Sequence, residues 1–117
     1  MIEVWGIPTC GTTRKALKLL ADAGIAHVFR NYRETAPTKA MLKDALAAVD
    51  HPKKLFNTSG AAYREGGWSA KSASITATEI VPILLADPML IKRPIVRTDK
   101  GTTVGFDADR IMALVSA

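Results

Sequence analysis

The chain contains very little cysteine, histidine and aromatic residue, and each shortage excludes a class of protein. Its single cysteine, Cys10, among 117 residues rules out a framework of internal disulfides. The two histidines, His27 and His51, do not form the clustered spacing of a metal site with Cys10, so no metal is expected. Aromatic residues make up 6% of the sequence and do not interleave with runs of Lys or Arg. Direct nucleic-acid binding through a stacking surface is therefore not expected.

Long apolar runs are absent as well. No uninterrupted run is long enough to span a bilayer, and charged residues interrupt the first twenty positions, where a secretion signal would have an apolar core. We therefore expect a cytoplasmic protein with no membrane partner. A chain of 117 residues with 48% apolar content can build one core but not two, which predicts a single domain over 1–117.

The most informative stretch is Pro8–Ala16, a tight loop between an apolar run at 2–5 and an amphipathic run that ends near Ala23. Within this run the spacing i, i+3, i+4 and i+7, which places residues on one face of a helix, is occupied by Leu17, Leu20, Ala21 and Gly24. Cys10 is thus placed at a helix N-terminus, where free amides and the helix dipole stabilise an anion. We predict a thiol that ionises below its free pKa of about 8.5. The same amides could hold an oxyanion beside the sulfur.

Three known motifs fail at this loop, each at one residue. A phosphatase-type loop needs Arg six residues after the cysteine, where Ala16 stands, and a nucleotide P-loop needs Lys at the position of Thr12. A thioredoxin-type site needs a second cysteine at the position of Thr13, so any disulfide chemistry must be monothiol or use an outside thiol. The alternative is that Cys10 is a small buried hydrophobe, and its turn-forming polar neighbours argue against such burial.

Apolar periodicity predicts a strand, a helix and a second strand, followed by a helical insert over about 36–88. Residues 25–32 are rich in strand formers and follow Gly24, a plausible left-handed end of the first helix. Pro37 suits the first turn of the next helix, whose apolar positions recur up to Val49.

The second half of the insert carries a capping-box signature. Thr76 and Glu79 stand three residues apart before an apolar run, which predicts a helix that ends at Asp87. Pro82 conflicts with a long helix here, so we expect the helix to begin late, near Thr78, or to bend.

The C-terminal quarter has the pattern of a hairpin and a final helix. Pro94 opens a strand that includes Ile95 and Val96, 99–101 form a turn, and 102–106 return as the second strand. Asp107 can cap the last helix. The resulting order, β-α-β, helical insert, β-β-α, predicts an α/β protein with a thioredoxin-like fold and a mixed four-stranded sheet. A cysteine at the first βα turn is where such a fold presents its thiol.

Several segments resemble the arsenate reductase (ArsC)-like family, and within it the Spx and YffB branches more than the true arsenate reductases. They are Ile7–Ala16, Phe56–Gly60, Tyr63–Glu65, and Leu90–Ile95 followed by Val104–Phe106. The resemblance implies Cys10 as the nucleophile, with Arg93 beside it and Pro94 in the cis form. An arginine fork there would stabilise the thiolate and grip an anionic substrate, whereas an ordinary surface Arg ahead of a proline is the alternative.

The expected substrate-binding residues surround these two side chains. They are Thr9, Gly11, Thr12, Thr13, Arg14, Asn57, Thr58, Ser59 and Pro94. True arsenate reductases of this type place two further arginines on the oxyanion, at positions occupied here by Asn57 and Phe106. Their loss would cost several kcal/mol, because a hydrogen bond to a charged group is worth about 1.5–3 kcal/mol. The segment 57–59 could instead bind the backbone of glutathione, or form a plain polar turn.

Three functions follow, in order of expectation. The first is a monothiol thiol/disulfide reductase, an enzyme acting on a small anionic or disulfide substrate, with glutathione as co-substrate or a glutaredoxin as partner. The second is arsenate reductase, and the third is an Spx-like regulator that binds the α subunit of RNA polymerase. Thr13 removes the two-cysteine switch of that regulator. No bound cofactor is expected. A net charge of +5 fits attraction of anionic substrates, or simply a solvated surface.

Overall fold

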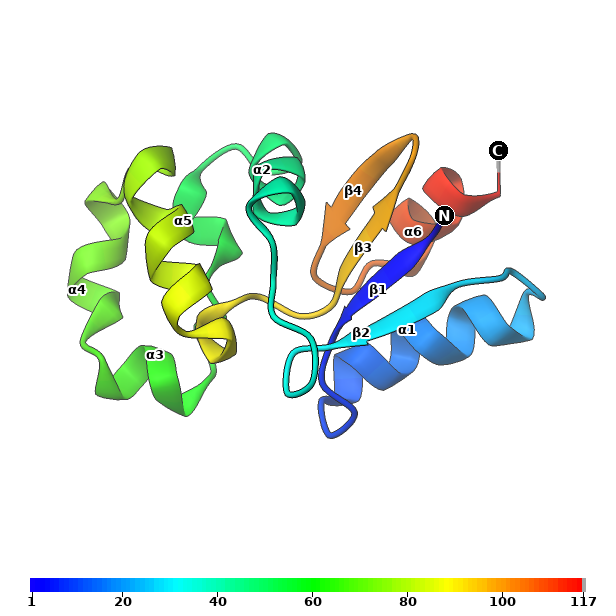
Figure 1. Cartoon of the computed structure of the whole chain (residues 1–117), viewed down its shortest axis with the longest axis horizontal. Helices are drawn as coiled ribbons and strands as arrows, with labels where there is room; N and C mark the ends of the chain where they lie inside the picture. The colour runs from blue at the N-terminus through cyan, green and yellow to red at the C-terminus, as the bar shows by residue number, and fades with distance from the viewer. Residues whose placement is uncertain (117) are drawn as a thin grey trace.

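The computed structural model describes residues 1–116, in which four strands form one mixed sheet (Figure 1). The strands are β1 (Glu3–Gly6), β2 (Val28–Asn31), β3 (Ile95–Thr98) and β4 (Gly101–Val104). Their order is β2-β1-β3-β4, with β1 parallel to β2 and the other two pairings antiparallel. The expected thioredoxin-like fold with a mixed four-stranded sheet is confirmed.

Alternation along the strands divides the core between the two faces of the sheet. Val4 lies opposite Val96, and both are buried on the face covered by α1 (Gly11–Asp22) and α6 (Ala108–Val115). The next pair, Trp5 and Ile95, points to the other face and packs against the helices between β2 and β3. Each face therefore has its own helical cover, as period-two alternation requires.

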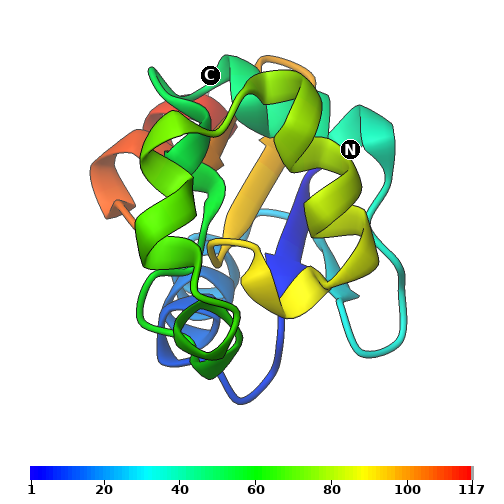
Figure 2. The ribbon, with the colours of Figure 1, turned by 90° about the vertical axis from the view of Figure 1, so that its left-hand side faces the viewer.

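The regular secondary structure between β2 and β3 is helical. Its elements are α2 (Lys39–Ala47), η1 (Pro52–Leu55), α3 (Ala61–Glu65), α4 (Trp68–Lys71), η2 (Ser72–Ser74), α5 (Ala77–Ala86) and η3 (Pro88–Leu90). Figure 2 views the molecule from the side of these helices and shows the strands behind them. Phe56 packs against Tyr63 and Trp68, with ring centroids 5.6 and 5.4 Å apart. None of the helices within residues 1–116 is long and apolar enough to cross a membrane.

The structure corrects the predicted face of α1. The buried residues of this helix are Thr13, Ala16 and Leu20, whereas Ala21 and Gly24 are exposed. The small apolar Ala21 is compatible with either side of a helix, so spacing alone could not orient α1 on the sheet. Gly24 does end the helix in the left-handed conformation, with φ of 69°, as predicted.

One helix start differs from prediction. Pro37 does not lie in the first turn of α2, because Thr38 caps that helix by accepting a hydrogen bond from the Met41 amide at 3.1 Å. The other helix, α5, begins at Ala77, one residue before the predicted start near Thr78, and it contains Pro82. Its capping box is complete, and the two reciprocal bonds fix the first turn immediately after the cap.

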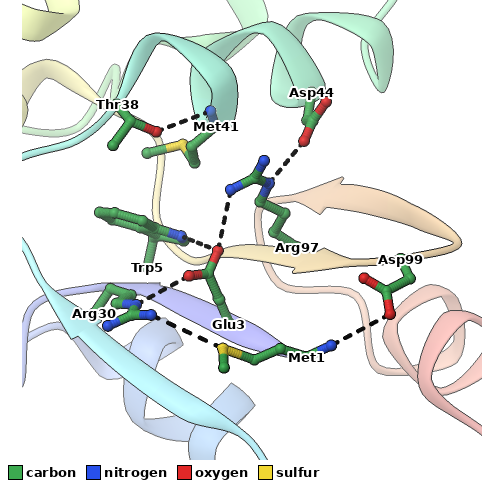
Figure 3. Close-up of polar contacts among 9 residues, drawn as sticks. All are labelled: Met1, Glu3, Trp5, Arg30, Thr38, Met41, Asp44, Arg97 and Asp99. Carbon is green, nitrogen blue, oxygen red and sulfur yellow. Dashed lines mark hydrogen bonds and ion pairs between the residues drawn. The ribbon is translucent and has the colours of Figure 1, made fainter.

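A charge cluster around Glu3 joins three strands to α2 (Figure 3). The Glu3 carboxylate accepts hydrogen bonds from Arg30 on β2 at 3.0 Å and from Arg97 on β3 at 3.3 Å. Arg97 also pairs with Asp44 of α2 at 2.7 Å. Partial burial acts to raise the pKa of Glu3, but the bonds from Arg30, Trp5 and Arg97 outweigh it and hold this pKa below its ordinary value.

We expect Glu3→Gln to lower the free energy of unfolding by about 1–3 kcal/mol, because two arginines lose a charged acceptor. Asp22→Asn, which breaks an exposed pair with Lys18, should cost less than about 0.5 kcal/mol. Urea unfolding measures both. Because the folded-state pKa of Glu3 is depressed, its contribution is complete above its unfolded pKa and is lost as pH falls through the folded value. If the difference in free energy of unfolding between wild type and Glu3→Gln persists unchanged in strong acid, this assignment is contradicted.

Candidate active site

The reactive cysteine lies where the loop after β1 becomes α1. The Cys10 amide donates to the Ile7 carbonyl at 3.1 Å and closes a turn with Pro8 at its second position. The Arg14 amide then donates to the Cys10 carbonyl at 3.0 Å, which begins the helix. Cys10 is therefore the N-cap of α1, and its predicted position at a helix N-terminus is confirmed.

The surroundings of Cys10 favour the thiolate. Desolvation by partial burial acts to raise the pKa of the thiol, but several groups act against it more strongly. They are the hydroxyls of Thr12 and Thr13, the Thr13 amide and the charge of Arg93, and together they lower the pKa to about 6. The first turn of α1 contains no acidic residue that would oppose ionisation. At neutral pH the sulfur is therefore mostly ionised.

The Thr12 hydroxyl links the sulfur to the segment that holds Arg93. It lies 3.2 Å from Cys10 Sγ and donates to the Arg93 carbonyl at 3.1 Å. A hydroxyl has one hydrogen, so Thr12 cannot donate to both at once. In the thiol form Cys10 can donate to Thr12, whereas in the thiolate form the Thr12 hydrogen must turn to the sulfur. The ionisation of Cys10 is thus coupled to the bond that joins α1 to Arg93.

Thr13 stands behind the sulfur and is fully buried. Its hydroxyl has no conventional hydrogen-bond partner in the part of the chain that the structure describes, so the thiolate is the acceptor open to it. The fit depends on Gly6, because a Cβ at that position would collide with the Thr13 hydroxyl and lie 2.7 Å from its methyl carbon. The glycine that ends β1 therefore makes room for a group that stabilises the thiolate.

Arg93 precedes β3 and reaches the same cavity. The Arg93–Pro94 bond is cis, as the family resemblance implied, and the Pro94 carbonyl accepts from the Gly105 amide at 2.9 Å. The Arg93 Nη1 group lies 3.7 Å from the sulfur of Met89. The Arg93 Nε group is buried without a hydrogen-bond partner among residues 1–116, whereas the residue itself lines the cavity. A guanidinium in this place can bind an anion.

The polar loop after η1 forms the opposite wall. Phe56 forms an antiparallel β-bridge with Ile91, and the backbone amide of Asn57 donates to the Leu90 carbonyl at 2.8 Å. These two contacts hold the loop against the segment that leads to Arg93. The Ser59 hydroxyl donates to Asn57 Oδ1 at 3.3 Å. Asn57 is only 9% exposed, whereas Thr58 and Ser59 are exposed.

These segments enclose a cavity of about 540 Å³, a size typical of small-molecule sites. It is lined by five of the predicted site residues, namely Cys10, Thr12, Asn57, Ser59 and Arg93. The other predicted residues, Thr9, Gly11, Thr13, Arg14, Thr58 and Pro94, lie outside this lining. Thr13 and Pro94 still act on it through the contacts described above, and Thr58 lines a neighbouring cavity.

Sequence reasoning missed a second group of lining residues. It comprises Gly60, Lys92, Val104, Gly105, Asp107 and Arg110. Phe106, expected where arsenate reductases have an arginine, also lines the cavity. Lys92 could have been found from its place beside Arg93, but Arg110 lies on α6 and reaches the cavity only through the packing of that helix.

Comparison with known proteins agrees with this geometry. A model of the ArsC family matches residues 5–114. The uncharacterized protein YusI of Bacillus subtilis is 39% identical over 105 residues, which cover 88% of this chain and 88% of YusI. The arsenate reductase of Escherichia coli is 30% identical over 115 residues, covering 97% of this chain and 80% of that protein. An ArsC family related protein from Bacteroides fragilis has a crystal structure that matches with a TM-score of 0.86, 33% identity and 97% coverage of both chains.

We expect the pH dependence of Cys10 alkylation by iodoacetamide to have its midpoint near pH 6. Thr12→Val removes a hydrogen bond to the thiolate and should raise the midpoint by about one pH unit or more, whereas Thr12→Ser keeps the hydroxyl and should leave it nearly unchanged. Arg93→Gln should raise it less, because Arg93 contributes less than the hydroxyls. A wild-type midpoint near 8.5, or no response to Thr12→Val, would refute this account of the thiol.

Gly6→Ala should displace Thr13, raise the pKa of Cys10 and lower the thermal stability. Gly11→Ala is the matched control, because a Cβ at Gly11 meets no atom within 4 Å and alanine favours a helix. Alkylation profiles and thermal unfolding of the two variants test the difference. Equal behaviour of both would show that the Thr13 position does not govern the thiol.

Proposed function

The chain belongs to the ArsC family, as its motifs predict, and on that basis we propose that it is a monothiol thiol/disulfide reductase. The observation that carries the proposal is a low-pKa thiol, Cys10, in a cavity beside Arg93, in a chain that has no other cysteine. Cys10 is the nucleophile, and an outside thiol completes the cycle.

The first step forms a mixed disulfide. The Cys10 thiolate attacks one sulfur of a substrate disulfide, the original S–S bond breaks, and the other half leaves as a thiolate that takes a proton from water. A glutathione thiolate then attacks the substrate-derived sulfur, and Cys10 leaves as a thiolate. After both steps one half of the substrate has been released as a thiol and the other half is joined to glutathione in a disulfide. A second glutathione thiolate exchanges with that disulfide, which releases the second half as a thiol and forms oxidised glutathione. A glutaredoxin can replace glutathione as the resolving thiol, and the reducing cytoplasm is the compartment that suits this cycle.

Arg93 and Asn57 have different roles in this proposal. The Arg93 guanidinium binds an anionic group of the substrate close to the sulfur. Asn57, held by its backbone bond to Leu90, offers a neutral amide suited to a peptide-like group such as the backbone of glutathione.

Arsenate reduction is the second candidate, and it is supported by the name of the Escherichia coli relative and by Arg93. One feature ranks it lower. The cavity offers Asn57 and Phe106 where the family resemblance implies two further arginines in such enzymes.

We expect one glutathione adduct on Cys10 after exposure of the folded protein to oxidised glutathione at pH 7, and none in Cys10→Ser. Reduced glutathione should release the adduct. Intact-protein mass spectrometry measures both steps. In parallel, arsenate with reduced glutathione and a glutaredoxin should yield no arsenite above the reaction without protein. Absence of the adduct removes the central step of the reductase, and arsenite formation that depends on Cys10 would establish the second candidate instead.

A further inference from the structure

A second cavity of about 820 Å³ adjoins the active-site cavity and is lined by residues of η1, α4 and the end of β4. Three residues, Lys92, Val104 and Arg110, line both cavities and so lie between them. A ligand bound at Cys10 meets two cations if it extends in this direction.

The position of Lys92 is fixed by its neighbours. Its amide donates to the Leu55 carbonyl at 2.7 Å, which ties the residue to η1. Its side chain runs close to Gly105, where an added Cβ would lie 3.3 Å from Lys92 Cε. Gly105 is buried with φ of 83°, a conformation that glycine adopts readily, and its missing side chain leaves room for the lysine.

Arg110 lies on the first turn of α6. Its backbone amide donates to Asp107 Oδ1 at 3.2 Å, which is the N-cap bond of that helix. The side chains of Arg110 and Lys92 make no ion pair within residues 1–116. The boundary between the two cavities thus presents two cations that are not paired with a carboxylate of the described chain.

The described residues that line the two cavities include two carboxylates, and each already has a hydrogen-bond or ion-pair partner. Asp107 caps α6, and Asp50 pairs with Lys54 at 2.6 Å. The lining cations are Lys53, Lys54, Lys92, Arg93 and Arg110. Five cations against two carboxylates leave a positive potential in a partly enclosed space, where it acts more strongly than on an open surface.

We infer that Lys92 and Arg110 form a carboxylate-binding subsite that selects disulfides carrying negative charge on the chain attached to sulfur. This inference rests on the proposed function, because the substrate is bound while Cys10 attacks it. The chemistry is the same thiol–disulfide exchange. The two cations of the subsite pair with a carboxylate on the half of the substrate disulfide that remains attached to Cys10. The ligand class is an anionic organic disulfide, which includes acidic thiol peptides.

The test compares three disulfides of similar length that differ in charge. They are the dianion of dithiodipropionic acid, the neutral bis(2-hydroxyethyl) disulfide and the dication cystamine. Rates of mixed-disulfide formation at Cys10 are divided by the rates for an unstructured peptide with one cysteine, which removes intrinsic differences in reactivity. The proteins are wild type, Lys92→Gln/Arg110→Gln, and Lys43→Gln. Lys43 is exposed on α2 and lines neither cavity, so this control changes the net charge without touching the subsite.

We expect wild type to prefer the dianion over the neutral disulfide by about tenfold, since two partly exposed charge pairs together contribute on the order of one factor of ten. The double variant should lose this preference, measured as the ratio of its rates with the dianion and with the neutral disulfide. Lys43→Gln should retain the preference, and so should the conservative variant Arg110→Lys. The preference should also weaken with added salt.

The experiment distinguishes a failure of the subsite from a failure of the proposed function. If Cys10 reacts with the neutral disulfide but shows no preference for the dianion, the subsite is refuted and the reductase stands. A preference that survives in the double variant, or that Lys43→Gln removes equally, would assign it to the overall charge and overturn the role of these two residues. If no disulfide reacts with folded wild type, the proposed function fails, and the subsite falls with it.

Discussion

The antiparallel pairing of β1 with β3 is the constraint on which the site depends. Because the strands run in opposite directions, the end of β1 lies beside the beginning of β3, with Trp5 opposite Ile95. The loop that follows β1 carries Cys10, and the segment that precedes β3 carries Arg93. A register fixed by buried side chains thus brings together two groups separated by more than eighty residues of sequence. The Thr12 hydroxyl then closes the gap by donating to the Arg93 carbonyl at 3.1 Å.

The third side of the site is held by the same kind of backbone pairing. The Lys92 amide donates to the Leu55 carbonyl, and the Asn57 amide donates to the Leu90 carbonyl, so the polar loop follows the segment that leads into β3. Phe56 anchors this pairing in the core, where it is 1% exposed and packs on two aromatic rings. The loop is therefore positioned by the fold, and Asn57 and Ser59 reach the cavity without a long flexible connection.

The sequence predicted features whose signals lie within a few residues of one another. The thiol before a helix, the Thr76 capping box and the left-handed Gly24 are all of this kind, and so is the hairpin of β3 and β4. It did not predict contacts that arise only when distant elements pack. Arg110 reaches the cavity because α6 covers the sheet, and the Glu3 cluster forms because three strands and α2 meet there. The error in the buried face of α1 has the same origin, since periodicity defines a stripe but not the surface that the stripe contacts.

Under the proposed function, a low thiol pKa lets one cysteine serve where a thioredoxin-type site uses two. With a pKa of about 6, roughly nine-tenths of Cys10 is ionised at pH 7, compared with a few per cent of a free thiol. The same property makes Cys10 a good leaving group, because a thiol of low pKa departs faster from a disulfide. Stabilising the thiolate also disfavours any accumulated mixed disulfide at equilibrium. A monothiol site built this way needs no internal partner for release, provided that an outside thiol can reach the substrate-derived sulfur.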